Sequence, residues 1–201
     1  MSDHFLEKAY AARDADQTRA LYDQWSATYE AEVGANGYAT PARSAQALAR
    51  FCDDLTQPLL DFGCGTGLAG LAFRLAGFST IDGVDLSAQM LEQAREKNVY
   101  RTLTCIDAET KLTGAYDLIS AVGVIGAGAA PISTLDRLMH ALPSAGKLVF
   151  SFNDHTLAEP ENTGRLNEWL DCGAAQLLFM EHGDHLPGKN MNATVYVVQK
   201  A

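Results

Sequence analysis

A glycine-rich turn follows an apolar run near residue 60, and it is the first segment of the chain suited to bind a ligand through its backbone. The apolar residues 59–62 are followed by Gly63, Gly65 and Gly67, and a second apolar stretch begins directly afterwards. A strand, a glycine turn and a helix in this order bind nucleotide-like ligands at the carboxyl edge of an open α/β sheet. Glycine permits positive φ and lets a ligand approach the main chain without a Cβ in the way. The segment therefore predicts a binding loop rather than a plain turn.

The spacing of the glycines alone does not identify the ligand, because Gly65, Gly67 and Gly70 also satisfy the dinucleotide spacing G-x-G-x-x-G. Charge separates the two ligand classes. Asp61 lies two residues before the first glycine, where a carboxylate opposes a pyrophosphate and favours a ligand that carries an ammonium group. S-adenosylmethionine has an α-ammonium and a sulfonium and no phosphate, so Asp61 favours it over a nicotinamide dinucleotide.

Two further acids follow the next two apolar runs. Asp85 lies 18 residues after Gly67 and suits a ribose acceptor, which both ligand classes require. Asp107 and Ala108 follow the third run, where a carboxylate can accept from an adenine amino group, although a turn or helix cap explains Asp107 equally well. These residues predict an adenosine site on one rim of the sheet.

The elements that position these residues alternate between strands and helices, which is the pattern of a parallel α/β sheet. We expect parallel strands at residues 58–62, 79–84, 101–105, 116–122 and 147–152, an antiparallel pair at 175–181 and 194–199 joined through a Gly/His/Pro loop, and helices near 67–76, 88–97, 132–142 and 163–172.

An amphipathic helix is expected to precede the sheet. From Thr18 onward, Tyr22, Trp25 and Tyr29 recur at helical spacing, and a second helix begins at Pro41. The aromatic face is either a buried core stripe or a lid over the binding site. Residues 1–15 are expected to form a frayed arm or a short lid helix.

Length and charge limit the class of protein. The chain has 201 residues with 25 acidic and 15 basic side chains, a net charge of −10, which argues against binding a phosphate backbone or an anionic membrane. Its length predicts one domain. Four cysteines without C-x-x-C spacing indicate free thiols, and neither a signal peptide nor an apolar run of membrane length is apparent, so we expect a cytoplasmic protein.

In these motifs the chain resembles the class I S-adenosylmethionine-dependent methyltransferase family. The resemblance covers roughly residues 20–155 and rests on four motifs in the required order, at residues 61–67, 83–87 with Met90, 107–108 and 116–119. It implies an α/β, Rossmann-like three-layer sandwich with a seven-stranded, mostly parallel sheet whose last strand is antiparallel, and an N-terminal helical cap. We expect a single methyltransferase domain over residues 1–201, with the cap in 1–50 and the Rossmann-like core in 51–201.

Within that family, residues 21–30, 37–41 and 121–128 are similar to the cap and the loop after strand four of the Williams–Beuren-region methyltransferase-like proteins. The family resemblance implies S-adenosylmethionine as cofactor and assigns its contacts. The methionine end would be held by Asp61, Gly63, Cys64, Gly65 and Gly67, the ribose by Asp85, the adenine faces by Leu86 and Met90, and the adenine edge by Asp107 and Ala108, while Tyr22 and Tyr29 would close the pocket and Val122 would complete it.

Methyl transfer from a sulfonium is an in-line displacement, so aligning the reactants in a dry pocket supplies much of the catalysis. His155 is the candidate general base, with a solvated loop histidine as the alternative. We predict no metal, because His182 and His185 lack further ligands and no carboxylate ends strand four to pair with residues 153–154.

The acceptor is expected to be a small molecule that the sequence does not identify. The chain lacks the Asn/Asp-Pro-Pro-aromatic run of base-amino methyltransferases after strand four, and its charge disfavours nucleic acid. A nicotinamide-dependent oxidoreductase and a non-catalytic S-adenosylmethionine-binding protein stay open as alternatives, and the oligomeric state is not predicted.

Overall fold

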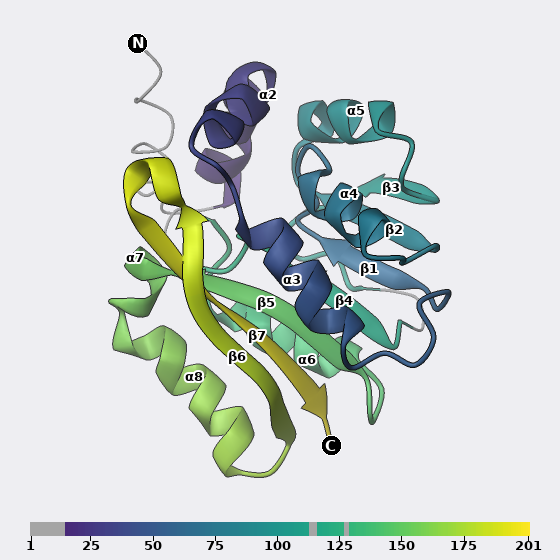
Figure 1. The fold of residues 1–201 in the computed structure, drawn as a ribbon, viewed down its shortest axis with the longest axis vertical. Coiled ribbons are helices and arrows are strands. Elements are labelled where there is room, and N and C mark those ends of the chain that lie inside the picture. Colours follow the sequence, from purple (N-terminus) through teal and green to yellow (C-terminus); the bar gives the residue numbers. More distant parts are fainter. Residues whose placement is uncertain (1–14, 113–115, 127–128) are drawn as a thin grey trace.

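Seven strands form one sheet at the centre of the computed structural model, which describes residues 15–112, 116–126 and 129–201 (Figure 1). The strands are β1 (Leu59–Phe62), β2 (Ile81–Asp85), β3 (Thr102–Cys105), β4 (Leu118–Ala121), β5 (Lys147–Asn153), β6 (Ala175–Leu186) and β7 (Met191–Lys200). Their order across the sheet is β3-β2-β1-β4-β5-β7-β6. Strands β1 to β5 are parallel, and β7 is antiparallel to both β5 and β6. The predicted fold class is confirmed.

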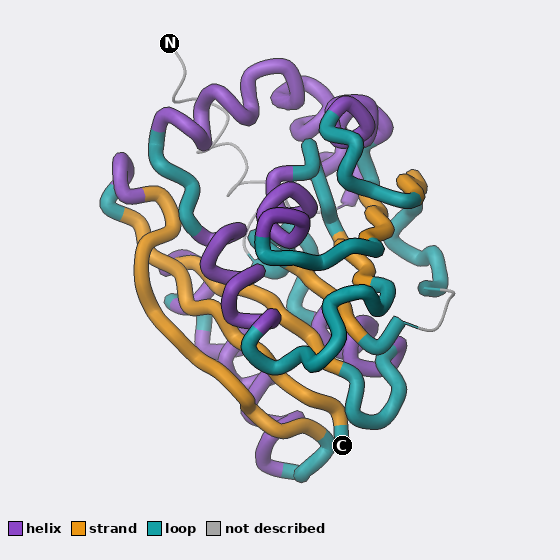
Figure 2. Tube along the Cα trace, turned by 45° about the vertical axis from the view of Figure 1, so that its right-hand side comes forward, coloured by secondary structure: helices purple, strands orange, loops and turns teal. Residues whose placement is uncertain are grey.

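The centre of the sheet is covered on both faces, which explains why β1 and β4 are buried along their whole length. On one face, Leu60, Ile119 and Phe150 pack in a cluster with α6 (Ser133–Ala141) and α8 (Pro160–Asp171). On the other, Leu59 and Leu118 pack with α3 (Thr40–Ala49) and α4 (Leu68–Leu75). Figure 2 shows the resulting layers of helix, strand and helix.

Helix α2 (Ala15–Ala35) lies outside these layers and is held by α5 (Ala88–Glu96) rather than by the sheet. Asp23 of α2 accepts a hydrogen bond from the Ser87 hydroxyl at the start of α5, and Glu30 pairs with Lys97 just beyond its end. This helix is the cap. The predicted arm at residues 1–15 lies outside the described residues apart from Ala15.

Helix α3 was expected to belong to the cap, but it packs on the sheet. Ala45 and Leu48 are fully buried in the cluster that contains β1, β4 and β7. Of the cap predicted in residues 1–50, the described part that stands over the edge of the sheet is therefore α2 with the linker that follows it.

The hairpin of β6 and β7 is longer than expected. Residues 182–186, predicted as a loop, continue β6, and the tip is a single 3-10 turn at Pro187–Lys189. The tip contacts the linker between α2 and α3: the N–H of Gly188 donates to the Asn36 carbonyl at 3.1 Å, and the N–H of Ala39 donates to the His185 carbonyl at 3.0 Å. The hairpin thus fixes where the cap joins the core.

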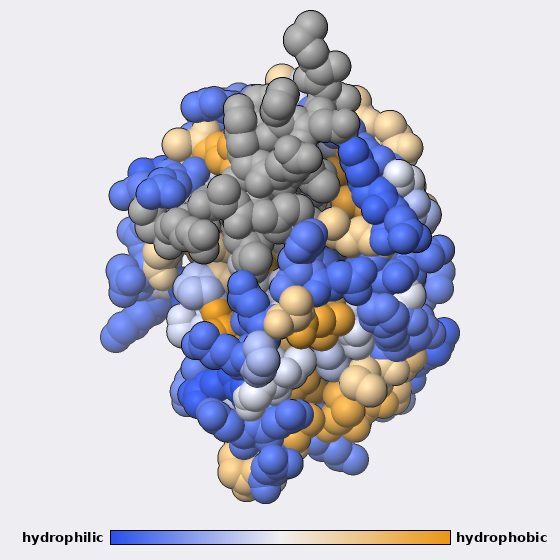
Figure 3. Space-filling model, turned by 90° about the vertical axis from the view of Figure 1, so that its left-hand side faces the viewer, coloured by the Kyte–Doolittle hydropathy of each residue, from blue (hydrophilic) through white to orange (hydrophobic). Residues whose placement is uncertain are grey.

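In the coloured part of the face shown in Figure 3, polar and charged side chains predominate, and apolar side chains gather toward its lower part. Over the described residues, no helix combines the length and the apolar character that a membrane crossing requires.

Candidate functional site

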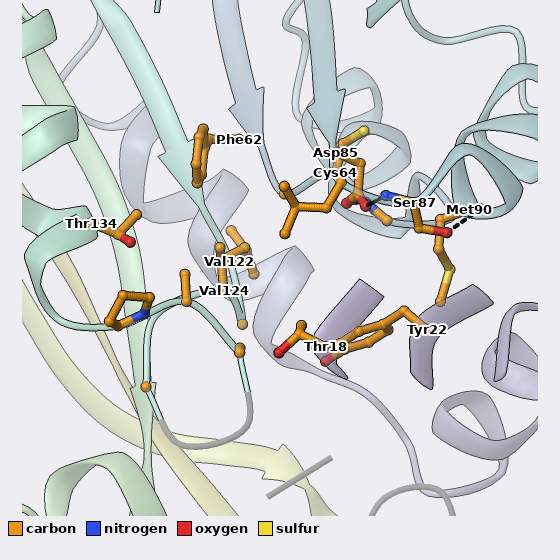
Figure 4. Close-up of a pocket in the computed structure, with 18 of the residues that line it drawn as sticks. Thr18, Tyr22, Phe62, Cys64, Asp85, Ser87, Met90, Val122, Val124 and Thr134 are labelled. Carbon is orange, nitrogen blue, oxygen red and sulfur yellow. Dashed lines mark hydrogen bonds between the residues drawn. The ribbon is translucent and has the colours of Figure 1, made fainter. Parts of the chain in front are cut away.

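A cavity of about 610 Å³ opens at the carboxyl ends of β1, β2 and β4, beneath the cap (Figure 4). Its volume lies in the range of small-molecule sites, about 300–1,000 Å³. The wall is shared between the glycine loop after β1, the start of α5, the segments after β3 and β4, the cap with its linker, and the N-terminal turn of α8.

The glycine loop needs its glycines for conformation and for space. Gly63, Gly65 and Gly67 have φ of +68°, +53° and +92°, values that residues with a Cβ rarely adopt. A Cβ on Gly63 would also lie 2.5 Å from Val124 Cγ2, so this glycine lets the loops after β1 and β4 meet. Gly63, Cys64 and Gly65 line the cavity, whereas Gly67 caps α4 without lining it.

Thr66 supplies an unsatisfied group in the same loop. Its side chain is 1% exposed, it lines the cavity, and its hydroxyl has no hydrogen-bond partner among the described residues. A buried hydroxyl without a partner costs free energy, which a polar ligand atom can recover.

Asp85 ends β2 and faces the cavity. Its Oδ2 accepts from the Gly65 N–H at 2.8 Å and its Oδ1 accepts from the Ser87 N–H at 2.9 Å. Burial raises the pKa of this carboxyl above its usual value. Each oxygen keeps acceptor capacity beyond one backbone bond, so the carboxylate can receive two neighbouring hydroxyls.

Apolar side chains also line the cavity. Met90 and Phe62 are buried, and Leu86, Ile106 and Val122 belong to the wall as well. Such side chains suit the two faces of a flat aromatic ring. The predicted residues Leu86, Met90, Ala108 and Val122 all lie on the wall, whereas Phe62 and Ile106 were missed because their apolar runs predicted core strands.

Asp61 does not line the cavity. Its side chain is 1% exposed, with Oδ2 accepting from the Tyr100 hydroxyl at 2.7 Å and Oδ1 from the Ser120 hydroxyl at 2.8 Å. Burial raises the pKa of Asp61 to about 6, against the opposing effect of the two hydroxyls. The carboxylate therefore lies behind the glycine loop, and the direct contact expected with the methionine end is not available in this arrangement.

Asp107 caps a turn. Its carboxylate accepts from the Glu109 N–H at 3.1 Å and from the Thr110 hydroxyl at 2.6 Å, while its neighbours Ala108 and Glu109 line the cavity. This is the second of the two interpretations that the sequence left open, and the adenine contact of Asp107 stays a prediction.

Arg137 was not predicted. From α6 it donates to the carbonyls of Ala108 and Thr110, and its guanidinium carbon lies 5.3 Å from the centre of the Phe62 ring. Arg137 thus fixes the segment after β3 against the rim. No local motif identifies it, because the contact spans 29 residues of sequence.

The aromatic face of the cap divides between the core and the cavity. Trp25 is 2% exposed and packs edge-on against Tyr29 at 4.9 Å between ring centroids, whereas Tyr22 and Tyr29 line the cavity. Trp25 is therefore a core residue, whereas Tyr22 and Tyr29 lie where the lid interpretation places them. Burial raises the pKa of Tyr29 well above its usual value, with Tyr38, Tyr22 and Asp85 adding to the effect.

Four further wall residues were not predicted from the sequence. Tyr38 comes from the linker after α2, and a Cβ on Gly123 would lie 2.6 Å from its hydroxyl oxygen. Glu159, Glu161 and Asn162, at the start of α8, also line the cavity. The glycine after β4 and the position of residues 159–162 beyond β5 are the signals that could have indicated them.

His155 is exposed on α7 (Asp154–Leu157) and lies outside the cavity wall. The cause is local: Asn153 caps this short helix by accepting from the Thr156 N–H at 2.9 Å, which places residue 155 on the outer side. The site expected for a general base is therefore not occupied by this histidine.

His182 and His185 lie on β6, not in a loop. His185 is buried, its Nδ1 is 2.8 Å from the Thr40 hydroxyl, and burial lowers its pKa to about 4. His182 Nδ1 is 3.0 Å from the Thr194 hydroxyl. No group of three or more His, Cys, Asp or Glu side chains in the described ranges is arranged to hold a metal.

The strand order and the cavity at the carboxyl edge define a Rossmann-like α/β protein with a ligand site under a helical cap. Comparison with family models matches residues 37–193 to the methyltransferase domain family. The chain belongs to this family. The predicted class I S-adenosylmethionine-dependent methyltransferase is thereby confirmed as its class, and S-adenosylmethionine as the cofactor of that class.

Individual relatives agree with this assignment. Methyltransferase-like protein 27 of Homo sapiens is 31% identical over 146 residues, which cover 66% of this chain and 57% of that protein. The match thus spans little more than half of the length of that relative.

Solved structures share the fold at low identity. A [4+2]-cyclase, SpnF, has a TM-score of 0.70 at 16% identity and covers 94% of this chain and 97% of its own. An S-adenosylmethionine-dependent methyltransferase from Clostridium acetobutylicum has a TM-score of 0.62 at 15% identity, with 90% and 99% covered.

Proposed function

We propose that the chain binds S-adenosylmethionine in the cavity beneath α2 and transfers its methyl group directly to a small-molecule acceptor. The observation that carries the proposal is one cavity of about 610 Å³ whose wall combines two groups of residues. We assign one end, for the cofactor, to the glycine loop, Asp85, Leu86 and Met90. We assign the other end, for the acceptor, to Tyr38, the segment after β4 and the start of α8.

The first end fits the cofactor. Asp85 would accept the ribose hydroxyls, Leu86, Met90 and Val122 would contact the adenine faces, and the backbone at Ala108 would meet the adenine edge. The methionine end would lie against the glycine loop, where the Thr66 hydroxyl lacks a partner among the described residues.

The cofactor would supply a methyl group on a good leaving group, so the protein mainly has to align the acceptor and exclude water. Tyr29 and Tyr38 would form the roof over the two reactants. If the acceptor must release a proton, Glu159 and Glu161 are the carboxylates on the wall at its end, and they replace His155 as candidate proton acceptors.

The acceptor class follows from enclosure and charge. Residues of the cap helix, of the linker after it and of the start of α8 share the cavity wall, which favours a small molecule over a polymer. A net charge of −10 disfavours nucleic acid. The four cysteines are free thiols, which supports our proposal of a cytoplasmic location.

Two experiments test the proposal. Calorimetry should detect binding of S-adenosylmethionine and S-adenosylhomocysteine and none of NAD. Saturable NAD binding with no response to S-adenosylhomocysteine would reject the proposal.

The second experiment identifies the acceptor. The protein is incubated with methyl-labelled cofactor and, separately, with a small-metabolite extract, total RNA and a protein fraction. We expect label only in the metabolite arm. Label in RNA or protein would refute the small-molecule acceptor, and cofactor binding without transfer in any arm would favour a non-catalytic binding protein.

A further inference from the structure

Tyr100 lies beneath the glycine loop, although it comes from the connection between α5 and β3. Its hydroxyl donates to Asp61 Oδ2 at 2.7 Å and accepts from the Gly70 N–H at 3.2 Å. Asp61 belongs to β1 and Gly70 to the first turn of α4. The Tyr100 hydroxyl therefore links β1 and α4, the two elements that flank the glycine loop.

Three glycines leave room for the Tyr100 ring. A Cβ on Gly70 would lie 2.2 Å from the Tyr100 hydroxyl oxygen, one on Gly83 would lie 3.0 Å from Cδ1, and one on Gly67 would lie 3.1 Å from Cε2. Gly67 and Gly70 are the last two glycines of the dinucleotide-like spacing. The glycines at these two positions are thus explained by the space that the Tyr100 ring needs.

Asp61 depends on this phenol. The carboxylate is 1% exposed, and its side-chain hydrogen bonds come from two neutral hydroxyls, those of Tyr100 and Ser120. The titratable groups that act on it or respond to it are Tyr100, Asp85 and Cys64. Hydrogen bonds to a buried charged group are worth about 1.5–3 kcal/mol each, so the ionised form of Asp61 relies on both hydroxyls.

We propose that Tyr100 is a positioning residue for the cofactor: its hydroxyl holds the Asp61 carboxylate behind the glycine loop, from where the negative charge attracts the ammonium end of the cofactor. The inference rests on the proposed function. It assigns Asp61 an electrostatic role across the loop in place of a direct contact, and it makes Tyr100 a determinant of cofactor affinity that does not touch the cofactor.

A purely structural role for Tyr100 predicts a different result. In that case the ring fills space between α4, α5 and β2, and removing its hydroxyl changes stability without changing how cofactor affinity responds to pH. Tyr100→Phe separates the two roles because it keeps the ring and removes only the donor to Asp61.

The test measures S-adenosylhomocysteine affinity by calorimetry from pH 5 to 8. In the wild type, affinity should fall as pH drops through about 6, the pKa of Asp61. In Tyr100→Phe the fall should begin about one pH unit higher, since loss of a hydrogen bond to the ionised form raises the pKa. Affinity at pH 6 should then be about fivefold weaker than in the wild type. Asp61→Asn should bind weakly with no such dependence.

A matched control comes from the other end of β2. The Tyr116 hydroxyl donates to Asp82 Oδ2 at 3.0 Å, and the Asp82 side chain is 3% exposed, so Tyr116→Phe removes a comparable tyrosine-to-aspartate bond away from the cavity. It should behave as the wild type. An unchanged pH midpoint in Tyr100→Phe, or a dependence retained in Asp61→Asn, overturns the inference.

A second variant and a second measurement keep the test decisive. Gly70→Ala should displace the phenol and shift the pH midpoint in the same direction as Tyr100→Phe, and thermal melting verifies that each variant is folded. Carbon-13 NMR of the Asp61 carboxyl in the unliganded protein follows the titration of Asp61 directly, without relying on ligand binding. If the wild type binds no S-adenosylhomocysteine, the proposed function fails. If Tyr100→Phe leaves the Asp61 titration unchanged, the inference about Tyr100 fails.

Discussion

Replacing Asp85 with alanine should weaken S-adenosylhomocysteine binding by about 1–3 kcal/mol, or about 5- to 150-fold, the scale of charged hydrogen bonds lost from a ribose. The carboxylate also accepts from two backbone N–H groups, those of Gly65 at 2.8 Å and Ser87 at 2.9 Å. Its loss therefore loosens the glycine loop as well. Because water in the cavity can hydrate both N–H groups, the free energy of unfolding should fall by only about 1–2 kcal/mol, and the protein should still fold.

Asp85→Asn is a milder change at the same position and should have a smaller effect on S-adenosylhomocysteine affinity. Its single carbonyl oxygen can keep one of the two backbone bonds, while its amide group opposes the other, so its affinity should lie between those of the wild type and Asp85→Ala. Calorimetric titration at pH 7.5 gives the affinities, and urea unfolding gives the stabilities.

Asp54 offers a matched control. Its carboxylate accepts from the Thr56 N–H at 2.8 Å, two residues on, as Asp85 accepts from Ser87, but it is exposed and lies outside the cavity wall. Asp54→Ala should leave S-adenosylhomocysteine affinity unchanged. Wild-type affinity in Asp85→Ala would refute the assignment of Asp85 as the ribose acceptor.

Three further predictions concern the cap and the pH dependence of stability. Trp25→Ala should lower the free energy of unfolding of the unliganded protein by about 3–5 kcal/mol because it empties a buried site, whereas Tyr29→Ala should reduce S-adenosylhomocysteine affinity with a smaller loss of stability. Amide exchange in α2 should slow when S-adenosylhomocysteine binds, because the ligand contacts the cap from below. His185, with a pKa of about 4 against 6.5 unfolded, should lower stability as pH falls through that interval, and Asp61, with about 6 against 3.8, should raise it.

Variants separate these effects. With each pKa difference worth about 3 kcal/mol, the two contributions nearly cancel in the wild type between pH 4 and 6. Urea unfolding should show His185→Asn gaining stability on acidification and Asp61→Asn losing it, and parallel curves for both variants would contradict the assignment. Equal losses of stability in Trp25→Ala and Tyr29→Ala would remove Tyr29 from the site, and amide exchange in α2 that ignores ligand would argue against a lid.

The parallel part of the fold and the cofactor end of the site follow closely from local sequence. Runs of strand-forming residues bounded by turn residues predicted β1 to β5 to within a few residues. In β1, β2, β4 and β5 the signal comes from burial along most of the strand, whereas β3 is mostly exposed. Asp85 was selected from its place at the end of a strand, and Leu86 and Met90 from the family resemblance; all three line the cavity.

The hairpin was misjudged where propensity and tertiary packing disagree. Residues 182–186 contain glycine, histidine and aspartate, which favour a loop. Pairing with β7 and the hydrogen bonds that Arg43 donates to the carbonyls of Glu181 and Asp184 hold them in β6 instead. Strand formation at an edge depends on such neighbours more than on residue type.

Site residues that depend on distant partners were not recoverable. Nothing near Asp61 in the sequence indicates that the hydroxyl of Tyr100, 39 residues later, donates a hydrogen bond to its carboxylate. Arg137 reaches the rim from α6 only because the sheet brings the segments after β3 and β4 together. The acceptor end likewise combines the cap linker with the start of α8, and neither segment carries a motif.

The hairpin tip that pins the cap linker has a consequence for synthesis on the ribosome. The contact between Thr40 and His185 spans 145 residues, and that between Arg43 and Ala193 spans 150. The linker that carries Tyr38 emerges first, but the strands that seat it emerge last, since chains fold as they leave the ribosome from the N-terminus. A nascent chain can hold the glycine loop and Asp85 long before its roof is fixed. If the proposed site binds S-adenosylmethionine, retention of this cofactor should therefore begin only when β7 has been made.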